Sequence, residues 1–302
     1  DGIRVLVRSR GLGDVYKRRG KALPEQLGAF FMLMRVKEES PEELAGFAQA
    51  CTPLWQDLKA DIIWPSYAGK RRQPLWYMLA MQLIKDAGYS ILIHGSHSHT
   101  PDRQFSADLS EDFSIKTASS HANAESLLQQ EKIAYLPCDL LHPEFQNWLM
   151  TKHTLGLRSP INTLLRLIAP EGSAGVQSVF HPNYGKTHQA ACALIGKEAL
   201  IMKGEGGEFE INPERTTQCI FTHRDEVEKV AGIQSHFEGK HSEPSKQALL
   251  DLWQNENDEY GLHATLRTTA VVLMLKDKAL SFELALIKAQ DLWQKRNTLA
   301  FS

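Results

Sequence analysis

The sequence predicts an α/β protein with a small N-terminal all-helical domain and a larger α/β domain built on a mostly parallel central sheet. Two helical segments open the chain, and from about residue 58 short apolar runs alternate with amphipathic segments. With 302 residues, 42% of them hydrophobic, the chain is long enough to bury a large core. We place the helical domain at 1–57, completed by 144–168, and the α/β domain at 58–143 and 169–302.

The first two helices are predicted at 24–36 and 41–51. Proline is tolerated in a first turn and a carboxylate suits the positive end of the helix dipole, so Pro24 and Glu25 indicate a helix start. Ser40 is typical of an N-cap, and Glu43 three residues later would complete a capping box. The chain therefore opens with a small helical unit.

The remaining elements follow from apolar runs and their spacing. Strand–helix alternation favours a mostly parallel sheet that is covered on both faces. Residues 144–168 interrupt this alternation with one or two helices, which we expect to return to the opening helices. We predict strands at 61–64, 90–94, 133–137, 176–181, 199–203 and 217–221, helices at 73–87, 122–130, 184–195, 244–256, 261–276 and 280–296, and a mobile loop at 235–245.

Four polar loops follow strands of the predicted sheet. Ligands of open parallel sheets collect at the carboxyl ends of the strands, so these loops are expected to meet at one edge. All four are rich in glycine, lysine, arginine or histidine, which are residues that bind phosphate groups. The loops are 65–72, 94–103, 181–188 and 203–215.

Two clusters in these loops admit metal interpretations. Glu205, Glu208 and Glu210 surround a glycine turn and would either hold Mg²⁺ or point into water. The three histidines at 94–99 invite a zinc interpretation, but no further ligands are spaced to support it. His94 is better interpreted as a hydrogen-bonding group that faces the cleft.

Charge and cysteine content limit the class of protein. The formal net charge is −2, but cations concentrate in residues 1–21 and 69–73, so the surface is electrically uneven. The four cysteines form no CxxC motif, which favours free thiols in a reducing cytoplasm. There is no apolar run of 18 residues and no signal-peptide pattern, so we expect no membrane span and a cytoplasmic location.

Three segments resemble the anthranilate phosphoribosyltransferase family. They are GAFFMLMRVKEESPEELAGFAQA (28–50), LGLRSPINTLLRLIAP (155–170) and HPNYGKTHQAACALIGKEALIMKGEGGEFE (181–210). The resemblance implies the fold of anthranilate phosphoribosyltransferases and nucleoside phosphorylases, and a homodimer formed through the helical domain.

The motifs of the family's active site are altered. Its glycine-rich GTGGDG loop, which binds the diphosphate of phosphoribosyl pyrophosphate, corresponds here to WPSYAGKRR (64–72). Its metal-binding Asp–Glu pair falls on Phe209 and Glu210, although Glu208 would be able to substitute. PSYAGKRRQ (65–73) and HPNY (181–184) resemble the YbiB-like branch, which implies binding of nucleic acid without marked sequence preference.

We therefore predict that a basic cleft binds DNA or RNA mainly through phosphates and requires no cofactor. The alternative is a Mg²⁺-dependent phosphoribosyltransferase that uses phosphoribosyl pyrophosphate and an unknown acceptor, with Mg²⁺ at Glu205, Glu208 or Glu210. A third interpretation is a structural or regulatory dimer. The residues predicted to contact nucleic acid or phosphate are Lys70, Arg71, Arg72, His94, Arg103, Lys152, Arg158, His181, Tyr184, Lys186 and Lys203.

Overall fold

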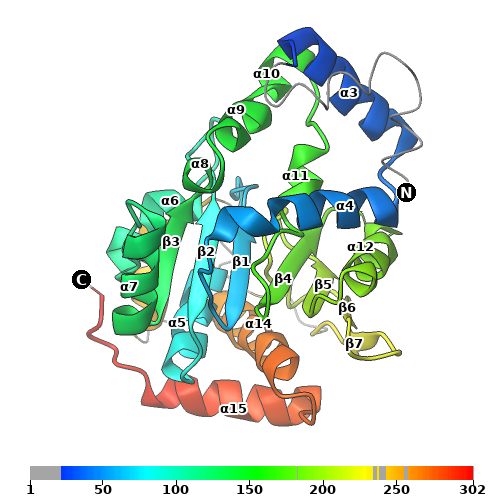
Figure 1. Cartoon of the computed structure of the whole chain (residues 1–302). Coiled ribbons are helices and arrows are strands. Elements are labelled where there is room, and N and C mark those ends of the chain that lie inside the picture. Colours follow the sequence, from blue (N-terminus) through cyan, green and yellow to red (C-terminus); the bar gives the residue numbers. More distant parts are fainter. Residues whose placement is uncertain (1–21, 182, 234–236, 238–242, 255–257, 302) are drawn as a thin grey trace.

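A seven-stranded sheet lies at the centre of the computed structural model, which describes residues 22–181, 183–233, 237, 243–254 and 258–301 (Figure 1). The strand order is β3-β2-β1-β4-β5-β6-β7. The first five strands pair in parallel, whereas β6 and β7 join the edge in antiparallel fashion. The strands are β1 (Ile62–Ser66), β2 (Ile91–Gly95), β3 (Ile133–Pro137), β4 (Ala174–Val179), β5 (Ala199–Lys203), β6 (Thr217–Phe221) and β7 (Glu228–Val230).

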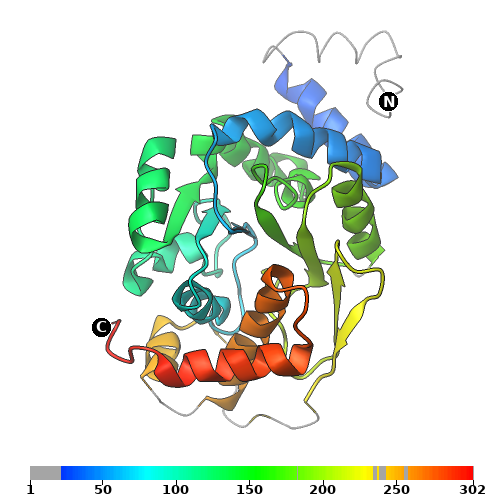
Figure 2. The same cartoon turned by 60° about the horizontal axis from the view of Figure 1, so that its bottom comes forward.

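Helices lie on both faces of this sheet, as Figures 1 and 2 show from two directions. The long helix α14 packs against both α5 and α15, and α12 packs against α4. The helices are α3 (Pro24–Lys37), α4 (Pro41–Cys51), α5 (Tyr77–Asp86), α6 (Ser106–Leu109), α7 (His121–Glu131), α8 (Cys138–Leu141), α9 (Glu144–Met150), α10 (Lys152–Leu155), α11 (Ile161–Leu164), α12 (Asn183–Leu194), α13 (Lys246–Trp253), α14 (Glu259–Lys276) and α15 (Phe282–Lys295), with 3-10 turns at Thr52–Trp55 and Glu111–Phe113.

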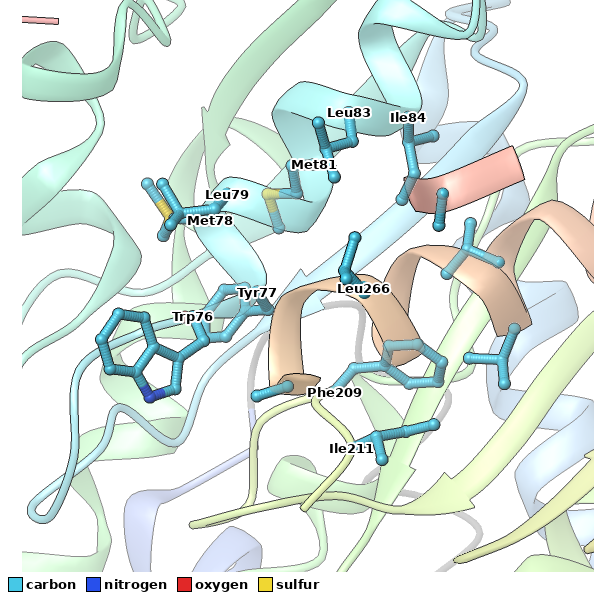
Figure 3. Close-up of a cluster of buried hydrophobic side chains, with 14 of the residues drawn as sticks. Trp76, Tyr77, Met78, Leu79, Met81, Leu83, Ile84, Phe209, Ile211 and Leu266 are labelled. Carbon is cyan, nitrogen blue, oxygen red and sulfur yellow. The ribbon is translucent and has the colours of Figure 1, made fainter. Parts of the chain in front are cut away.

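The core consists of two apolar clusters, one on each face of the sheet. One lies between the strands and helices α5, α13, α14 and α15. Figure 3 shows part of this cluster, with Phe209 and Ile211 of the segment after β5 beside α14. The other cluster joins the opposite face of the sheet to α4, α9 and α11. The helical segment, by which we mean the opening helices together with residues 144–168, therefore shares one core with the sheet.

The opening helices pack against the interrupting segment, as expected. Phe31 of α3 meets Trp148 of α9 edge-on, with ring centroids 6.0 Å apart. Ser40 caps α4, because its side chain accepts a hydrogen bond from the backbone N–H of Glu43, and the Glu43 carboxylate accepts from the N–H of Ser40. The predicted capping box is therefore confirmed.

The predicted fold class is confirmed, with local corrections. Strands β3, β5 and β6 coincide with their predicted ranges, and β7, only three residues long, was not predicted. Residues 144–168 form three short helices, not one or two, because Gly156 ends α10 in a left-handed conformation and Pro160 starts α11. Most of the predicted mobile loop at 235–245 lies outside the described residues.

Two further observations concern the class of protein. All four cysteines are free thiols, as predicted, and all four are buried. Among the residues that the structure describes, no helix is long and apolar enough to cross a membrane. The boundaries of the two domains stay a prediction.

Candidate anion-binding site

Hydrogen bonds join three of the four predicted loops at the carboxyl edge of the sheet. The turn after β1 pairs with the loop after β2, because Lys70 and Gln104 exchange both backbone hydrogen bonds at 2.9 Å. One guanidinium nitrogen of Arg103, Nη1, donates to the carbonyls of Ala68 and Gly69 and also reaches the carbonyl of Gly206 after β5, at 3.0, 2.8 and 3.3 Å. Arg103 therefore holds the three loops together.

A carboxylate of this chain occupies the turn after β1. The backbone N–H groups of Ala68 and Gly69 both donate to Oε1 of Glu208, each at 2.7 Å. Gly69 has φ +59°, and two successive N–H groups turned in the same direction form a concave site for an anion. The pKa of Glu208 is raised by burial, which outweighs the opposing effect of the nearby Arg166 guanidinium.

Lys70 forms a buried ion pair. Its ammonium donates to Oε1 of Glu210 at 2.5 Å and to the carbonyl of Pro74 at 2.7 Å, and neither charged side chain is exposed. The other oxygen of Glu210 accepts from the backbone N–H of Tyr77 at 2.9 Å. The prediction that Lys70 contributes charge to an open cleft is therefore wrong, because Glu210 neutralises it inside the protein.

The three glutamates do not fit a magnesium site. Glu208 accepts backbone hydrogen bonds, Glu210 pairs with Lys70, and Glu205 accepts from the amide of Asn212 at 2.8 Å. Mg²⁺ requires carboxylates that are open to water and to substrate phosphates. Among the described parts of the chain, no group of three His, Cys, Asp or Glu residues could hold a metal ion. The predicted Mg²⁺ ligands are thus committed to other contacts.

His94 is also buried away from any cleft. Its side chain has no exposed surface, and Nδ1 lies 2.6 Å from the hydroxyl of Tyr67. Burial lowers its pKa to about 3, so the imidazole is neutral at physiological pH. The expectation that His94 faces the cleft is wrong, because Trp55 and Tyr67 enclose the ring edge-on.

A cavity of about 580 Å³ opens between the helical segment and this edge of the sheet. Four arginines and one glutamate, Glu38, line it, so its charge is strongly positive. The helical segment contributes Arg35 at the end of α3, which the sequence analysis did not identify. The lining residues are Arg35, Glu38, Arg103, Arg158, Ser159, Asn162, Thr163, Arg166, Ser178, Val179, Phe180, His181, Tyr184, His188 and Gly207.

Several buried polar groups line the cavity without a partner. Among the described residues, Oγ of Ser159, Oγ of Ser178 and Nε2 of His188 make no hydrogen bond, although their residues are at most 4% exposed. Nδ1 of His188 lies 2.8 Å from Oε1 of Gln177, so Nδ1 carries the proton and Nε2 is left as an acceptor. Burial, helped by Arg166, lowers the pKa of His188 to about 3.

Arg166 forms the floor of the cavity. Its Nε donates to the carbonyl of Asn162 at 3.1 Å, and its Nη1 donates to the carbonyl of Ser178 at the end of β4. These two bonds fix the plane of the guanidinium group. A guanidinium group held in one plane favours bidentate contact with an oxyanion. Lys152 and Arg158 of the same segment were predicted as site residues, but neither Arg166 nor the buried Ser178 was.

The other predicted cations divide between the cavity and its surroundings. Arg103, Arg158, His181 and Tyr184 line the cavity itself.

Lys152 is turned toward the loop after β2, where its ammonium donates to Nδ1 of His99 at 2.7 Å and to the hydroxyl of Thr100. Arg71, Arg72 and Lys186 are exposed outside the cavity, and Lys203 lines a second hollow of about 230 Å³. The binding roles of these residues stay a prediction.

The chain matches two models of one family. The model described as glycosyl transferase family, helical bundle domain, matches residues 18–52, and the model described as glycosyl transferase family, a/b domain, matches residues 79–298. The uncharacterized protein YbiB of Escherichia coli (strain K12) is 28% identical over 72% of this chain and 70% of its own length. An anthranilate phosphoribosyltransferase of Desulfitobacterium hafniense (strain Y51) is 27% identical over 69% of this chain and 64% of its own length. The chain thus matches about two thirds of the length of each of these two relatives.

Solved structures share the fold. Anthranilate phosphoribosyltransferase from Thermus thermophilus superposes with a TM-score of 0.72 at 17% identity, covering 91% of this chain and 87% of that one. The enzyme from Saccharomyces cerevisiae, solved in complex with PRPP and Mg, gives a TM-score of 0.71 at 18% identity, covering 91% of this chain and 82% of that one. At such identities the likeness concerns the fold alone.

Proposed function

Because this chain belongs to the glycosyl transferase family that pairs a helical bundle domain with an a/b domain, we propose that it uses the cavity between its helical segment and the sheet to bind nucleic acid. The arginine-lined cavity of about 580 Å³ is the observation that carries this proposal. Arginine binds phosphate through two parallel N–H groups, and four guanidinium groups around one opening favour a polyanion. Such binding depends little on base sequence and weakens with salt.

The cations outside the cavity extend the positive surface. Arg71 is 69% exposed, and Arg72 and Lys186 are exposed as well, so they would meet phosphates that lie beyond the cavity mouth. Phe180, 66% exposed, and Tyr184 lie at the same opening and offer ring faces on which a base would stack. A single strand presents both phosphates and unpaired bases, and we therefore propose it as the preferred ligand.

The unpartnered polar atoms on the cavity floor support a ligand that carries hydrogen-bonding groups. His188 offers an acceptor, whereas Ser159 and Ser178 offer hydroxyls, and a buried group without a partner costs about 1–3 kcal/mol. A nucleotide carries both donors and acceptors, which would satisfy all three groups.

A phosphoribosyltransferase is the second candidate. It is favoured by the match to anthranilate phosphoribosyltransferases and by the size of the cavity. The commitment of Glu208 and Glu210 to Gly69 and Lys70 argues against it, because those carboxylates are not open to a metal–diphosphate ligand.

We also propose that the chain forms a homodimer through the helical segment. Leu33 and Val36, three residues apart on one side of α3, are 63% and 84% exposed. Large apolar side chains gathered on one surface are typical of an interface between subunits. Light scattering tests this proposal: a dimer that Val36→Glu converts to monomer supports it, and a wild-type monomer contradicts it.

The nucleic-acid proposal is tested by fluorescence anisotropy with a labelled single-stranded oligonucleotide. We expect the affinity to fall by more than about tenfold between about 50 and 200 mM salt. Arg158→Ala should weaken binding and reduce this salt dependence. Lys59→Ala is the matched control, because Lys59 is exposed just before β1, at the opposite edge of the sheet.

Two outcomes would reject the proposal. One is binding that does not change with salt, and the other is an equal loss of affinity in Arg158→Ala and Lys59→Ala. Consumption of phosphoribosyl pyrophosphate that depends on Mg²⁺, without salt-sensitive binding of nucleic acid, would favour the transferase instead.

A further inference from the structure

The second hollow, of about 230 Å³, lies beside the cavity at the carboxyl edge of the sheet. The end of β5 contributes Lys203 and Gly204 to its wall, and the start of β6 contributes residues 216–218. Val179, the last residue of β4, lines both the cavity and the second hollow. Because Val179 and Lys203 are paired in the sheet, the two spaces are direct neighbours.

The first turn of α12 forms the ridge between the two spaces. Tyr184 lines the cavity, and the next residue, Gly185, lines the second hollow. A Cβ atom on Gly185 would lie only 2.7 Å from Cδ1 of Ile220, so glycine lets α12 approach β6 closely. Lys186 of the same turn is exposed, and the first turn of a helix is the positive end of its dipole. A phosphate group that crosses this ridge therefore meets positive charge.

A second glycine brings the wall of the second hollow against the floor of the cavity. A Cβ atom on Gly204 would collide with Oγ of Ser178 and with the carbonyl oxygen of Glu208. Gly204 lines the second hollow, whereas Ser178 lines the cavity. The contact between these two residues is therefore all that separates the spaces at this point.

Two cations line the second hollow. Lys203 and Arg215 are both exposed, and neither forms an ion pair with another residue that the structure describes. Among the described residues, one carboxylate lines the hollow, that of Glu205, and it accepts from the side-chain amide of Asn212 at 2.8 Å. The hollow therefore keeps a net positive charge, which favours a phosphate group.

The floor of the second hollow is apolar and its rim is polar. Val179, Met202 and Ile220 line it and are at most 7% exposed, whereas Thr216 and Gln218 are exposed at the rim. Its volume is below the roughly 300–1,000 Å³ of pockets for drug-sized ligands. It therefore suits one nucleotide of a longer strand, with the base on the apolar floor and the phosphate at the two cations, better than a free small molecule.

The strand order places the positive regions of the surface in one line. β1, β4, β5 and β6 are neighbours in this order, and neighbouring strands lie about 4.8 Å apart. The exposed Arg71 and Arg72 follow β1, the cavity opens beside the end of β4, and the second hollow lies at β5 and β6. The distance from β4 to β6 is thus about 10 Å, which about three nucleotides span at about 3.4 Å each.

We propose that the second hollow is a further phosphate-binding subsite, in which Lys203 and Arg215 hold the backbone of a single strand that leaves the cavity over the first turn of α12. The adjacency of Val179, Gly185 and Lys203 carries this inference. It rests on the proposed function, because the strand must first occupy the cavity. It adds to that function the path of the strand and two phosphate contacts that the cavity does not supply.

Anisotropy titrations with a labelled oligothymidylate of about 12 nucleotides test this subsite. Lys203→Ala/Arg215→Ala should weaken binding at least about fivefold at about 50 mM salt and lower the salt slope by about 1.4, because each phosphate contact contributes about 0.7. Both positions are exposed, so the variant should fold.

Lys59→Ala/Lys288→Ala is the matched control, because it removes the same charge at the opposite edge of the sheet. Lys59 precedes β1, and Lys288 is an exposed residue of α15, which lies along that edge (Figure 1). This variant should keep the wild-type affinity and salt slope. An equal loss in both double variants would overturn the inference, because the effect would then come from net charge and not from a subsite.

A second measurement locates the strand without removing charge. The four native thiols are buried, so a thiol-reactive fluorophore should label Gln218→Cys at the rim of the second hollow selectively. Unlabelled oligothymidylate should change the emission of this probe and should leave a probe on Lys59→Cys unchanged. Saturating oligonucleotide that leaves the Gln218→Cys probe unchanged would overturn the inference.

The outcomes separate this inference from the proposed function. If the wild type binds the oligonucleotide in a salt-dependent way but Lys203→Ala/Arg215→Ala keeps its affinity and slope, the inference alone fails. If the wild type does not bind the oligonucleotide at all, the proposed function fails and the inference fails with it.

Discussion

The ammonium group of Lys70 lies 2.5 Å from Oε1 of Glu210, and neither side chain has any exposed surface. Each partner also makes another hydrogen bond inside the protein. Lys70 donates to the carbonyl of Pro74, and Glu210 accepts from the N–H of Tyr77. The pair connects the turn after β1 with the segment after β5. It is therefore a structural contact between two loops of the candidate site, and it removes one cation and one carboxylate from ligand binding.

Breaking this pair from one side should destabilise the fold. Lys70→Met leaves Glu210 buried without its counter-charge, and we expect a loss of about 3–5 kcal/mol in the free energy of unfolding. The double variant Lys70→Met/Glu210→Gln should recover part of this loss, because no buried charge is left. Urea denaturation measures both. Arg71→Ala, at an exposed neighbouring position, should stay within about 0.5 kcal/mol of the wild type, and an equal loss there would contradict the assignment.

The central strands were predictable from the sequence, whereas the pairing of Lys70 was not. Strands β1 to β5 are buried on both faces, and continuous apolar runs between turn residues reveal such strands. The run GKRR, by contrast, suggests an exposed basic turn. Only the fold brings Glu210 to Lys70 across 140 residues of chain, so local sequence patterns give no sign of the pairing.

Only part of the candidate site was predicted, because some of its residues come together only in the folded chain. The four loops were located because strand ends are visible in the sequence, and Arg103 and Arg158 do line the cavity. Arg35 resembles an ordinary cation in the last turn of α3, and nothing near it in the sequence indicates the cavity. Ser159 and Ser178 are small polar residues next to apolar ones, and their role as unpartnered lining groups depends on the tertiary structure.

The buried histidines should make the protein sensitive to mild acid. The pKa values of His94 and His188 fall from 6.5 to about 3 because burial disfavours the imidazolium form. The unfolded chain therefore binds more protons below pH 6.5, so this stability is present above 6.5 and is lost as the pH falls toward 3. Each histidine should contribute up to about 1.4 kcal/mol per pH unit.

Urea denaturation at about pH 7 and about pH 5 measures this effect. His188→Gln should lower the pH dependence by roughly one proton, and replacing the exposed His97 in the same way should not change it. A wild type whose stability is equal at both pH values would contradict the neutral, buried state of His188.

The cysteines should react slowly in the native protein. Burial raises the pKa of Cys51, Cys138 and Cys219 to about 12 and that of Cys192 to about 11, so very little thiolate is present at neutral pH. A thiol-specific reagent such as Ellman's reagent should label the folded protein slowly and should label all four thiols quickly in denaturant. Fast labelling of any one of them under native conditions would show that it is exposed to solvent.

The exposed basic turn should contribute to the salt dependence of nucleic-acid binding through Arg71 and Arg72, and not through the buried Lys70. Each phosphate contact to a single strand adds about 0.7 to the slope of log affinity against log salt, so losing two contacts in Arg71→Ala/Arg72→Ala should lower the slope by about 1.4. Lys59→Ala should leave the slope unchanged, because Lys59 precedes β1 at the far edge of the sheet. Anisotropy titrations over a series of salt concentrations give both slopes. If the double variant weakens binding and keeps the wild-type slope, the two arginines do not contact phosphates, and the strand leaves the cavity in another direction.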